Sequence, residues 1–203
     1  HGNGLYVACG ASGVILTSPD GITWTARTSV HGSNQINAVF FADNLFLACD
    51  FSGNISTSTD GINWTLRSNS FASSNTLFGF TYGAGQYLCF GNNAVLGSSP
   101  DGITWTAQNA GFTGGSNSIQ DGVYANGSFL LCGKVGDVRR SFDGINWSTI
   151  DIGATGTLFG INVNGSQTKL INLEQGSKLV TSDFLNFAGS TTQSTQGAAN
   201  RYV

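Results

Sequence analysis

Short hydrophobic runs alternate with polar and glycine-rich segments along the whole chain, and each run has the length of a single β-strand. In one representative unit the runs are Ile36–Phe41, Leu45–Cys49, Asn54–Ser58 and Trp64–Arg67. Turn-forming residues separate them, as between the strands of a meander. The pattern therefore predicts an all-β fold with four antiparallel strands in each unit.

The four-strand unit recurs together with one short motif. The sequence Ser-Pro-Asp-Gly-Ile-Thr-Trp stands at 18–24 and again, unchanged, at 99–105, with variants at 58–64 and 141–147 and a weaker copy at 181–187. Four strands in a repeat of about 40 residues is the spacing of a propeller blade. Counting from the fifth copy through the C-terminus and round to the first gives the same period, which predicts a five-bladed β-propeller. The aspartate and aromatic positions of the motif are Asp20, Trp24, Asp60, Trp64, Asp101, Trp105, Asp143, Trp147, Asp183 and Phe187.

The two ends of the chain complement each other. The first unit lacks an innermost strand, and the segment "AANRYV" (198–203) joined to "HGNGLYVACG" (1–10) is similar to "INAVFFADNLFLACD" in the second unit. We expect a single propeller domain, 1–203, whose ring is closed when the C-terminal strand 198–203 joins the N-terminal blade. The expected blades are 198–203 with 1–30, then 31–70, 71–112, 113–153 and 154–197.

The motif residues suit a tight turn between two strands. An aspartate can accept backbone N–H groups across the turn, a glycine can adopt a positive φ, and a tryptophan can cover the hairpin. The motif resembles the Asp-box, or BNR-like, hairpin of sialidase-type and related propellers, although the usual spacing places the glycine one residue further on. The resemblance covers about seven residues in each repeat, so it implies the fold and, with no catalytic set present, a non-enzymatic branch.

Charge is scarce in this chain. Only 9% of residues are charged, against about 25% in typical domains, and the net charge is −3 with eight Lys and Arg. A nucleic-acid partner needs a basic face, so none is expected. No apolar run reaches about 18 residues, so no membrane insertion is expected. A surface rich in Ser, Thr and Asn favours an extracellular protein: secreted, on a cell surface or on a virion surface. The absence of an initial Met leads us to expect a processed, trimmed or partial chain.

Candidates for catalysis are few. The only histidines are His1 and His31, so no Ser/His/Asp set is indicated. Asp50, Asp137 and Glu174 lie between second and third strands, where a carboxylate pair stays open as an alternative to solvated loop acids. No phosphate loop or dinucleotide fingerprint occurs, and the cysteines form no CxxC pair. We therefore expect no enzyme, no cofactor and no metal, with buried thiols at Cys9, Cys49, Cys89 and Cys132.

The loops opposite the motif turns vary most and form the expected binding rim. Phe51, Phe71 and Phe112 fall in or beside these loops, outside the alternating strand pattern, and Asn92 and Asn93 lie in the same set. Exposed aromatic rings flanked by Asn, Ser and Gly stack on sugars and bind their hydroxyls, although each Phe could instead fill its own loop. The leading hypothesis is a non-catalytic recognition or adhesion module, lectin-like or adhesin-like, that binds a cell-surface or environmental glycan.

The second hypothesis is structural. The terminal strand that would close the ring could enter the open blade of a neighbouring copy instead. Such a heterologous contact does not close on itself, and it propagates as an extracellular filament or sheath. The polar segment Gly189–Gly197 that precedes this strand has the composition of a flexible linker.

Overall fold

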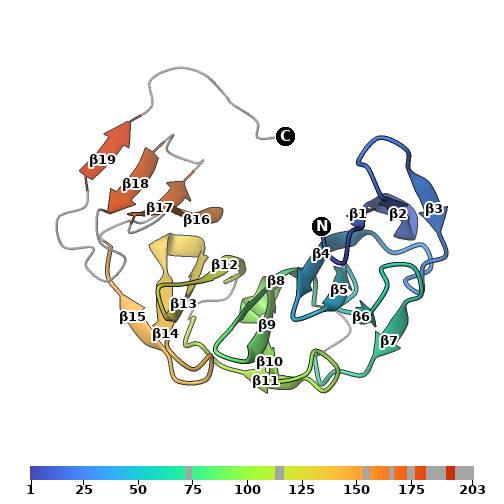
Figure 1. Cartoon of the computed structure of the whole chain (residues 1–203). Helices are drawn as coiled ribbons and strands as arrows, with labels where there is room; N and C mark the ends of the chain where they lie inside the picture. The colour runs from blue at the N-terminus through green and yellow to red at the C-terminus, as the bar shows by residue number, and fades with distance from the viewer. Residues whose placement is uncertain are drawn as a thin grey trace.

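The computed structural model describes residues 1–71, 75–112, 117–152 and 156–164, and the backbone of the strands at 167–172, 177–181 and 191–194. Five antiparallel sheets stand next to one another in chain order along an arc (Figure 1). The first sheet has three strands and each of the others has four. The all-β prediction is confirmed, whereas the expected closing strand at 198–203 lies outside the described residues.

The strands lie within one or two residues of the predicted runs. The first sheet contains β1 (Tyr6–Cys9), β2 (Ile15–Ser18) and β3 (Thr25–Arg27). The second contains β4 (Ile36–Ala42), β5 (Leu45–Asp50), β6 (Ile55–Ser58) and β7 (Thr65–Arg67). The third contains β8 (Leu77–Gly83), β9 (Gln86–Gly91), β10 (Leu96–Ser99) and β11 (Thr106–Gln108). The fourth contains β12 (Ile119–Ala125), β13 (Ser128–Gly133), β14 (Val138–Ser141) and β15 (Ser148–Ile150), and the fifth contains β16 (Gly160–Asn164), β17 (Gln167–Asn172), β18 (Ser177–Thr181) and β19 (Thr191–Ser194).

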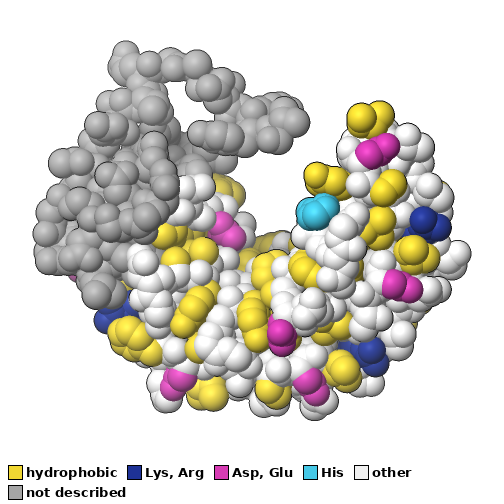
Figure 2. All heavy atoms as spheres, in the orientation of Figure 1, with side chains coloured by type: hydrophobic (Ala, Val, Ile, Leu, Met, Phe, Trp, Pro, Cys, Tyr) yellow, Lys and Arg dark blue, Asp and Glu magenta, His cyan; other side chains and the backbone are white. Residues whose placement is uncertain are grey.

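The strands of each sheet follow chain order from the inner side of the arc to its rim (Figure 1). The first strand of each complete sheet, namely β4, β8, β12 or β16, lies innermost. Antiparallel connections alternate between the two ends of a sheet, so the motif turns lie at one end and the loops between second and third strands lie at the other. On the face shown in Figure 2, charged side chains are widely spaced.

The motif turn is held by its own side chains. In the first copy the Ser18 hydroxyl donates to Asp20 Oδ1 (2.9 Å) and accepts the N–H of Gly21 (2.8 Å). The same Oδ1 atom accepts the next two backbone N–H groups, each at 2.8 Å. Gly21 has a φ of +74°, and the Trp24 indole donates to its carbonyl (3.2 Å). These contacts all recur in the second copy. The third copy lacks the Ser–Gly contact, and in the fourth copy the buried Trp147 indole N–H has no hydrogen-bond partner among the described residues.

Neighbouring sheets pack through these motif turns, and aromatic pairs link strands within a sheet. From the second sheet to the fourth, the motif glycine lies on the preceding sheet, as Gly61 lies on Leu5 and Val7 and Gly102 lies on Leu45 and Leu47. An aromatic pair joins the first and second strands of the second, third and fourth sheets. The ring centroids are 4.5 Å apart for Phe41–Phe46, 4.4 Å for Tyr82–Tyr87 and 4.7 Å for Tyr124–Phe129. A fourth pair, His1–Tyr6 at 4.3 Å, occupies the same place in the first sheet.

The first sheet exposes the face that other sheets bury. Tyr6 is 42% exposed, whereas Phe46 at the same place in the second sheet is 1% exposed. Trp24 is 40% exposed, whereas Trp64 is 7% exposed. The first sheet has no preceding sheet packed on its motif turn, and this leaves an aromatic face open at one end of the arc.

The cysteines of the described residues are free, and Cys49, Cys89 and Cys132 are buried as expected, whereas Cys9 is only partly buried. Burial raises the pKa of the Cys49 thiol well above its ordinary value, as expected for a thiol that packs as a small hydrophobic group. Among the residues that the structure describes, no group of three metal-ligating side chains occurs. No helix of the described chain is long and apolar enough to cross a membrane.

Candidate functional site

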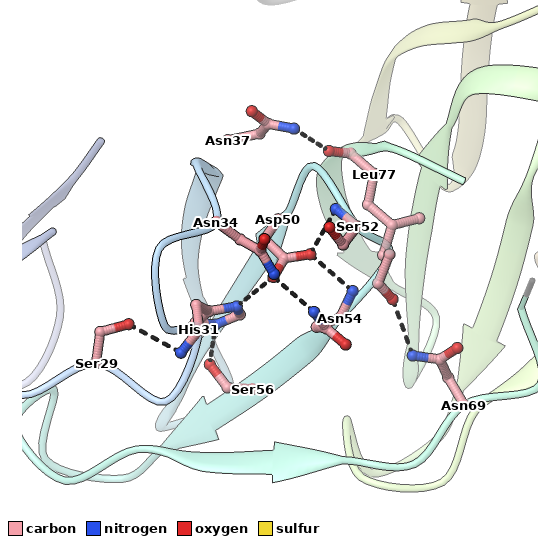
Figure 3. A network of polar contacts seen from close by, with 11 residues as sticks. Ser29, His31, Asn34, Asn37, Asp50, Ser52, Asn54, Ser56, Asn69 and Leu77 are labelled. Atoms are coloured by element: carbon pink, nitrogen blue, oxygen red, sulfur yellow. Dashed lines mark hydrogen bonds and ion pairs between the residues drawn. The ribbon is translucent and has the colours of Figure 1, made fainter. Parts of the chain in front are cut away.

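The loop between β5 and β6 is organised around one buried carboxylate (Figure 3). Asp50 Oδ1 accepts the backbone N–H groups of Ser52 and Asn54, each at 2.9 Å. Its Oδ2 accepts the side-chain amides of Asn54 (2.8 Å) and Asn34 (3.2 Å). These hydrogen-bond donors compensate the buried negative charge of the Asp50 carboxylate.

A histidine completes this polar network. His31 Nδ1 lies 2.9 Å from Asp50 Oδ2, and His31 Nε2 lies 2.8 Å from the hydroxyl of Ser56. Burial raises the pKa of Asp50, but hydrogen bonds from Asn54, His31 and the backbone outweigh it and hold the pKa below its ordinary value. The network ties β5 and β6 to the loop that leaves β3.

The structure corrects the sequence-based statement that no Ser/His/Asp set is indicated. Ser56, His31 and Asp50 lie in hydrogen-bonded order, the order of a hydrolase triad. The Ser56 side chain is fully buried, however, and His31 is nearly so. No substrate can reach the hydroxyl in this structure, so the three residues act as a structural network that fixes the loop.

This network is peculiar to the second sheet among the first four. The position of Asp50 is taken by a glycine in each of the others, namely Gly10, Gly91 and Gly133. In those sheets the loop forms a short 3₁₀ turn, whereas the loop after Asp50 is held by side chains. In those sheets the position of Asn54 is taken by Val14, Val95 and Asp137. Asp50 and Asn54 therefore give the second sheet a distinct loop.

The distinct loop presents an exposed aromatic ring. Phe51 is 62% exposed, yet its backbone is fixed on both sides. Its N–H donates to the carbonyl of Gln35 (2.9 Å), and its carbonyl accepts the hydroxyl of Thr76 (3.0 Å). The Asn69 amide donates to Gly53 in the same loop (3.0 Å). A ring on a pre-ordered loop loses little conformational entropy when it binds a ligand.

A cleft of about 250 Å³ lies close by, between the third sheet and the segment that connects β7 to β8. Phe71 lies against β10, where a Cβ on Gly97 would come within 2.1 Å of its ring. The Asn93 amide donates to Asn75 Oδ1 (3.1 Å), and the Gln108 amide donates to Ser98 (2.9 Å). The described residues that line the cleft are Ser70, Phe71, Asn75, Asn93, Ala94, Val95, Leu96, Ala107 and Gln108.

The structure brings some of the sequence-predicted site residues together and separates others. Phe71 and Asn93 line the same cleft, and Thr76, which holds Phe51, directly follows Asn75 of that cleft. Asn92 donates its N–H to the carbonyl of Thr76 (2.9 Å), while its own amide oxygen is buried.

Phe112 lies elsewhere and is 7% exposed, with the Arg139 guanidinium 5.5 Å from its ring centroid. It fills its own loop, which was the alternative weighed for each phenylalanine. The proposed pair of loop carboxylates does not form between Asp50 and Asp137, because Asp50 is bound to His31 and Asp137 to Arg139 (2.8 Å). Glu174, Asp183 and Phe187 lie outside the described residues.

No family model matches the chain, and no curated protein matches it. Solved structures do match. YCF48 from Cyanidioschyzon merolae aligns over 85% of this chain and 64% of its own, with a TM-score of 0.60 and 17% identity. Virginiamycin B lyase from Staphylococcus aureus aligns over 86% of this chain and 64% of its own, with a TM-score of 0.73 and 9% identity. A structure of YCF48 bound to D1 peptide has a TM-score of 0.59 and 12% identity, covering 84% of this chain and 57% of its own.

These likenesses correct one prediction and leave another open. The sequence led us to expect that the chain is not an enzyme. That expectation is wrong as a conclusion from the fold, because a lyase is among the structures that share this fold. The resemblance to Asp-box repeats stays a prediction, since no family model matches. The chain spans about 64% of the first two structures, and at these identities the likeness shows the fold alone. That fold is β-propeller-like.

Proposed function

We propose that this chain is a recognition module that binds a glycan in the cleft between the third sheet and the segment that connects β7 to β8. One observation carries the proposal: the described lining of the cleft combines the Phe71 ring with neutral amides and a hydroxyl, and it contains no charged side chain. Sugars present apolar faces and many neutral hydroxyls, so an aromatic ring with Asn, Gln and Ser groups matches them. The cleft is smaller than sites for drug-sized ligands, which begin at about 300 Å³, and it suits a single sugar ring.

Phe51 extends this site. The buried Asp50 network holds the loop, and the ring stands exposed beside the segment that contributes Asn75 to the cleft. A second sugar unit that leaves the cleft would meet this ring. The sparse charge of the chain supports the further proposal that the module works outside the cell, on a secreted protein or on a cell or virion surface.

A binding role is compatible with the comparisons, because one propeller-like neighbour is a complex of YCF48 with D1 peptide. For this chain a peptide is the second candidate. A peptide ligand uses charged ends and side chains that the described cleft does not complement. The uncharged lining therefore favours a neutral sugar.

A glycan array read with labelled protein tests the proposal. Wild-type protein should bind a defined set of neutral saccharides, and Phe71→Ala and Asn93→Ala should each reduce that binding by at least about tenfold, the effect of losing one buried polar or stacking contact. Asn146→Ala, on a motif turn at the other end of the sheets, is the matched control. Binding of peptides in place of saccharides, or equal loss in the control, would contradict the proposal.

For the whole chain we propose a five-bladed ring that strand 198–203 closes by pairing with β1. The supporting observations are the three-stranded first sheet and the exposed face of Tyr6 and Trp24. The same open edge also supports the alternative of a filament built by donation of this strand to a neighbour. Light scattering separates the two, because self-closure gives monomers at every concentration. Strand donation gives polymers that disappear when the chain is shortened to end before Ala198.

A further inference from the structure

A second cleft, of about 370 Å³, lies between the rim of the first sheet and the motif turn of the second. Its described lining consists of Ala26, Arg27, Thr28, Val30, Ile62, Asn63 and Trp64. Arg27 is the only basic residue among them. The cleft thus differs in charge from the neutral cleft described above.

The Arg27 guanidinium is fixed by one hydrogen bond. Its Nε donates to the hydroxyl of Thr17 on the adjacent strand β2 (2.8 Å). Within the described chain the terminal nitrogens of Arg27 have no hydrogen bond and no ion pair, although the chain as a whole is acidic. A guanidinium held at Nε presents its two terminal N–H₂ groups as a fork, and this fork matches the two oxygens of a carboxylate.

The groups around the fork are also placed for a ligand. The Asn63 amide donates to Asp60 Oδ2 (2.7 Å), so its own carbonyl oxygen stays available as an acceptor. Thr28 contributes a hydroxyl, and Ile62 and Trp64 contribute apolar surface. We propose that this cleft binds the carboxylate of a small ligand, with Arg27 as the anchor, at a site separate from the glycan cleft. An acidic sugar and the C-terminus of a peptide both carry this chemistry.

The equivalent positions in the second and third sheets indicate which substitution of Arg27 tests the proposal. Arg67 on β7 makes the equivalent bond to Thr57 (2.7 Å), and Gln108 on β11 makes it to Ser98 (2.9 Å). Glutamine is therefore an accepted partner at this strand position. Arg27→Gln should keep the bond to Thr17 and the fold while it removes the charged fork.

The experiment is an NMR titration that follows the indole N–H of Trp64, with sodium glucuronate, N-acetylglycine and methyl glucoside as the probes. We expect saturable shifts with at least one of the two carboxylates and none with the neutral sugar. Arg27→Gln should weaken carboxylate binding by at least about tenfold, as for loss of a charged hydrogen-bonding group. Arg67→Gln should leave it unchanged. The stronger of the two carboxylates identifies the source of the ligand.

Three results would overturn the proposal: no shift with either carboxylate, equal shifts with methyl glucoside, or equal weakening by Arg67→Gln, which would indicate general electrostatic attraction. Thermal unfolding of each variant shows that the fold is intact. Phe71→Ala should not change these shifts, so failure of the glycan proposal and failure of this one are distinguishable.

Discussion

At the residue scale, Asp50 and the residues bonded to it set the second sheet apart. Where the first, third and fourth sheets have glycine at the end of the second strand, the second sheet has Asp50. Its carboxylate collects backbone and amide N–H groups together with His31, and the loop that results displays Phe51. The buried carboxylate of Asp50 therefore fixes the loop that exposes the ring of Phe51.

Removal of this carboxylate should be costly. Asp50→Ala leaves His31 and two backbone N–H groups without their acceptor. We expect a loss of about 3–5 kcal/mol in the free energy of unfolding, as for removal of a buried group on which a hydrogen-bond network depends. Asp137→Ala breaks a pair with Arg139 whose side chains keep some contact with water, and it should cost less than Asp50→Ala. Urea denaturation measures both. A loss in Asp50→Ala no larger than in the control would show that the network does not hold the loop.

The motif carboxylates should make the protein sensitive to acid. Backbone N–H groups that donate to Asp20, Asp60, Asp101 and Asp143 lower the pKa of each below its ordinary value. A lowered folded-state pKa gives stability that is present above the unfolded value, about 4, and that is lost as the pH falls toward the folded value. We expect the melting temperature to be level above about pH 5 and to fall below it. The fall should be shallower in Asp60→Asn, and an unchanged slope would contradict this assignment.

At the element scale, the repeated turn joins sheets as well as strands. In the second, third and fourth sheets the motif glycine combines a positive φ with close contact to the sheet before it, and the tryptophan packs at the same junction. The copy at 99–105 is therefore constrained twice, by the turn and by the neighbouring sheet, whereas the copy at 18–24 is constrained by the turn alone.

Substitutions at two glycines measure the turn conformation and the contact between sheets separately. Gly102 has a φ of +71° and Leu45 lies 2.7 Å from where its Cβ would be, whereas Gly85 has a φ of +72° and open space. Gly85→Ala should lose about 1–2 kcal/mol for left-handed backbone. Gly102→Ala should lose a further 1–3 kcal/mol, roughly, for overpacking. Equal losses in chemical denaturation would mean that contact between sheets contributes nothing at this turn.

The sequence predicted most of the elements and only part of the site. The motif marks the turns and its period marks the repeats, so the positions of strands such as β4 to β7 can be predicted from the local sequence. The His31–Asp50–Ser56 network joins residues 19 and 25 apart through the pairing of two strands, and no local pattern records it. The three loop phenylalanines look alike in sequence. Packing against a neighbouring sheet buries Phe112 and leaves Phe51 exposed.

At the scale of the whole molecule, the open end of the arc decides between a closed ring and a polymer. Trp24 is exposed in the arc, but a closed ring would cover it as the neighbouring sheets cover Trp64 and Trp105. We expect acrylamide to quench Trp24 no more than Trp105, each measured with the other three tryptophans replaced by phenylalanine. Strong quenching of Trp24 in a monomer would contradict closure of the ring.

The central claim, that an uncharged cleft on this propeller-like fold binds a sugar, is tested most directly by the side-chain amide signals of Asn75, Asn93 and Gln108. These are followed by NMR while a saccharide selected on the array is added. The account expects these three signals to shift together and to saturate, with contacts from sugar protons to the Phe71 ring. If the saccharide binds while these signals stay still, or if no saccharide binds, the cleft is not the recognition site.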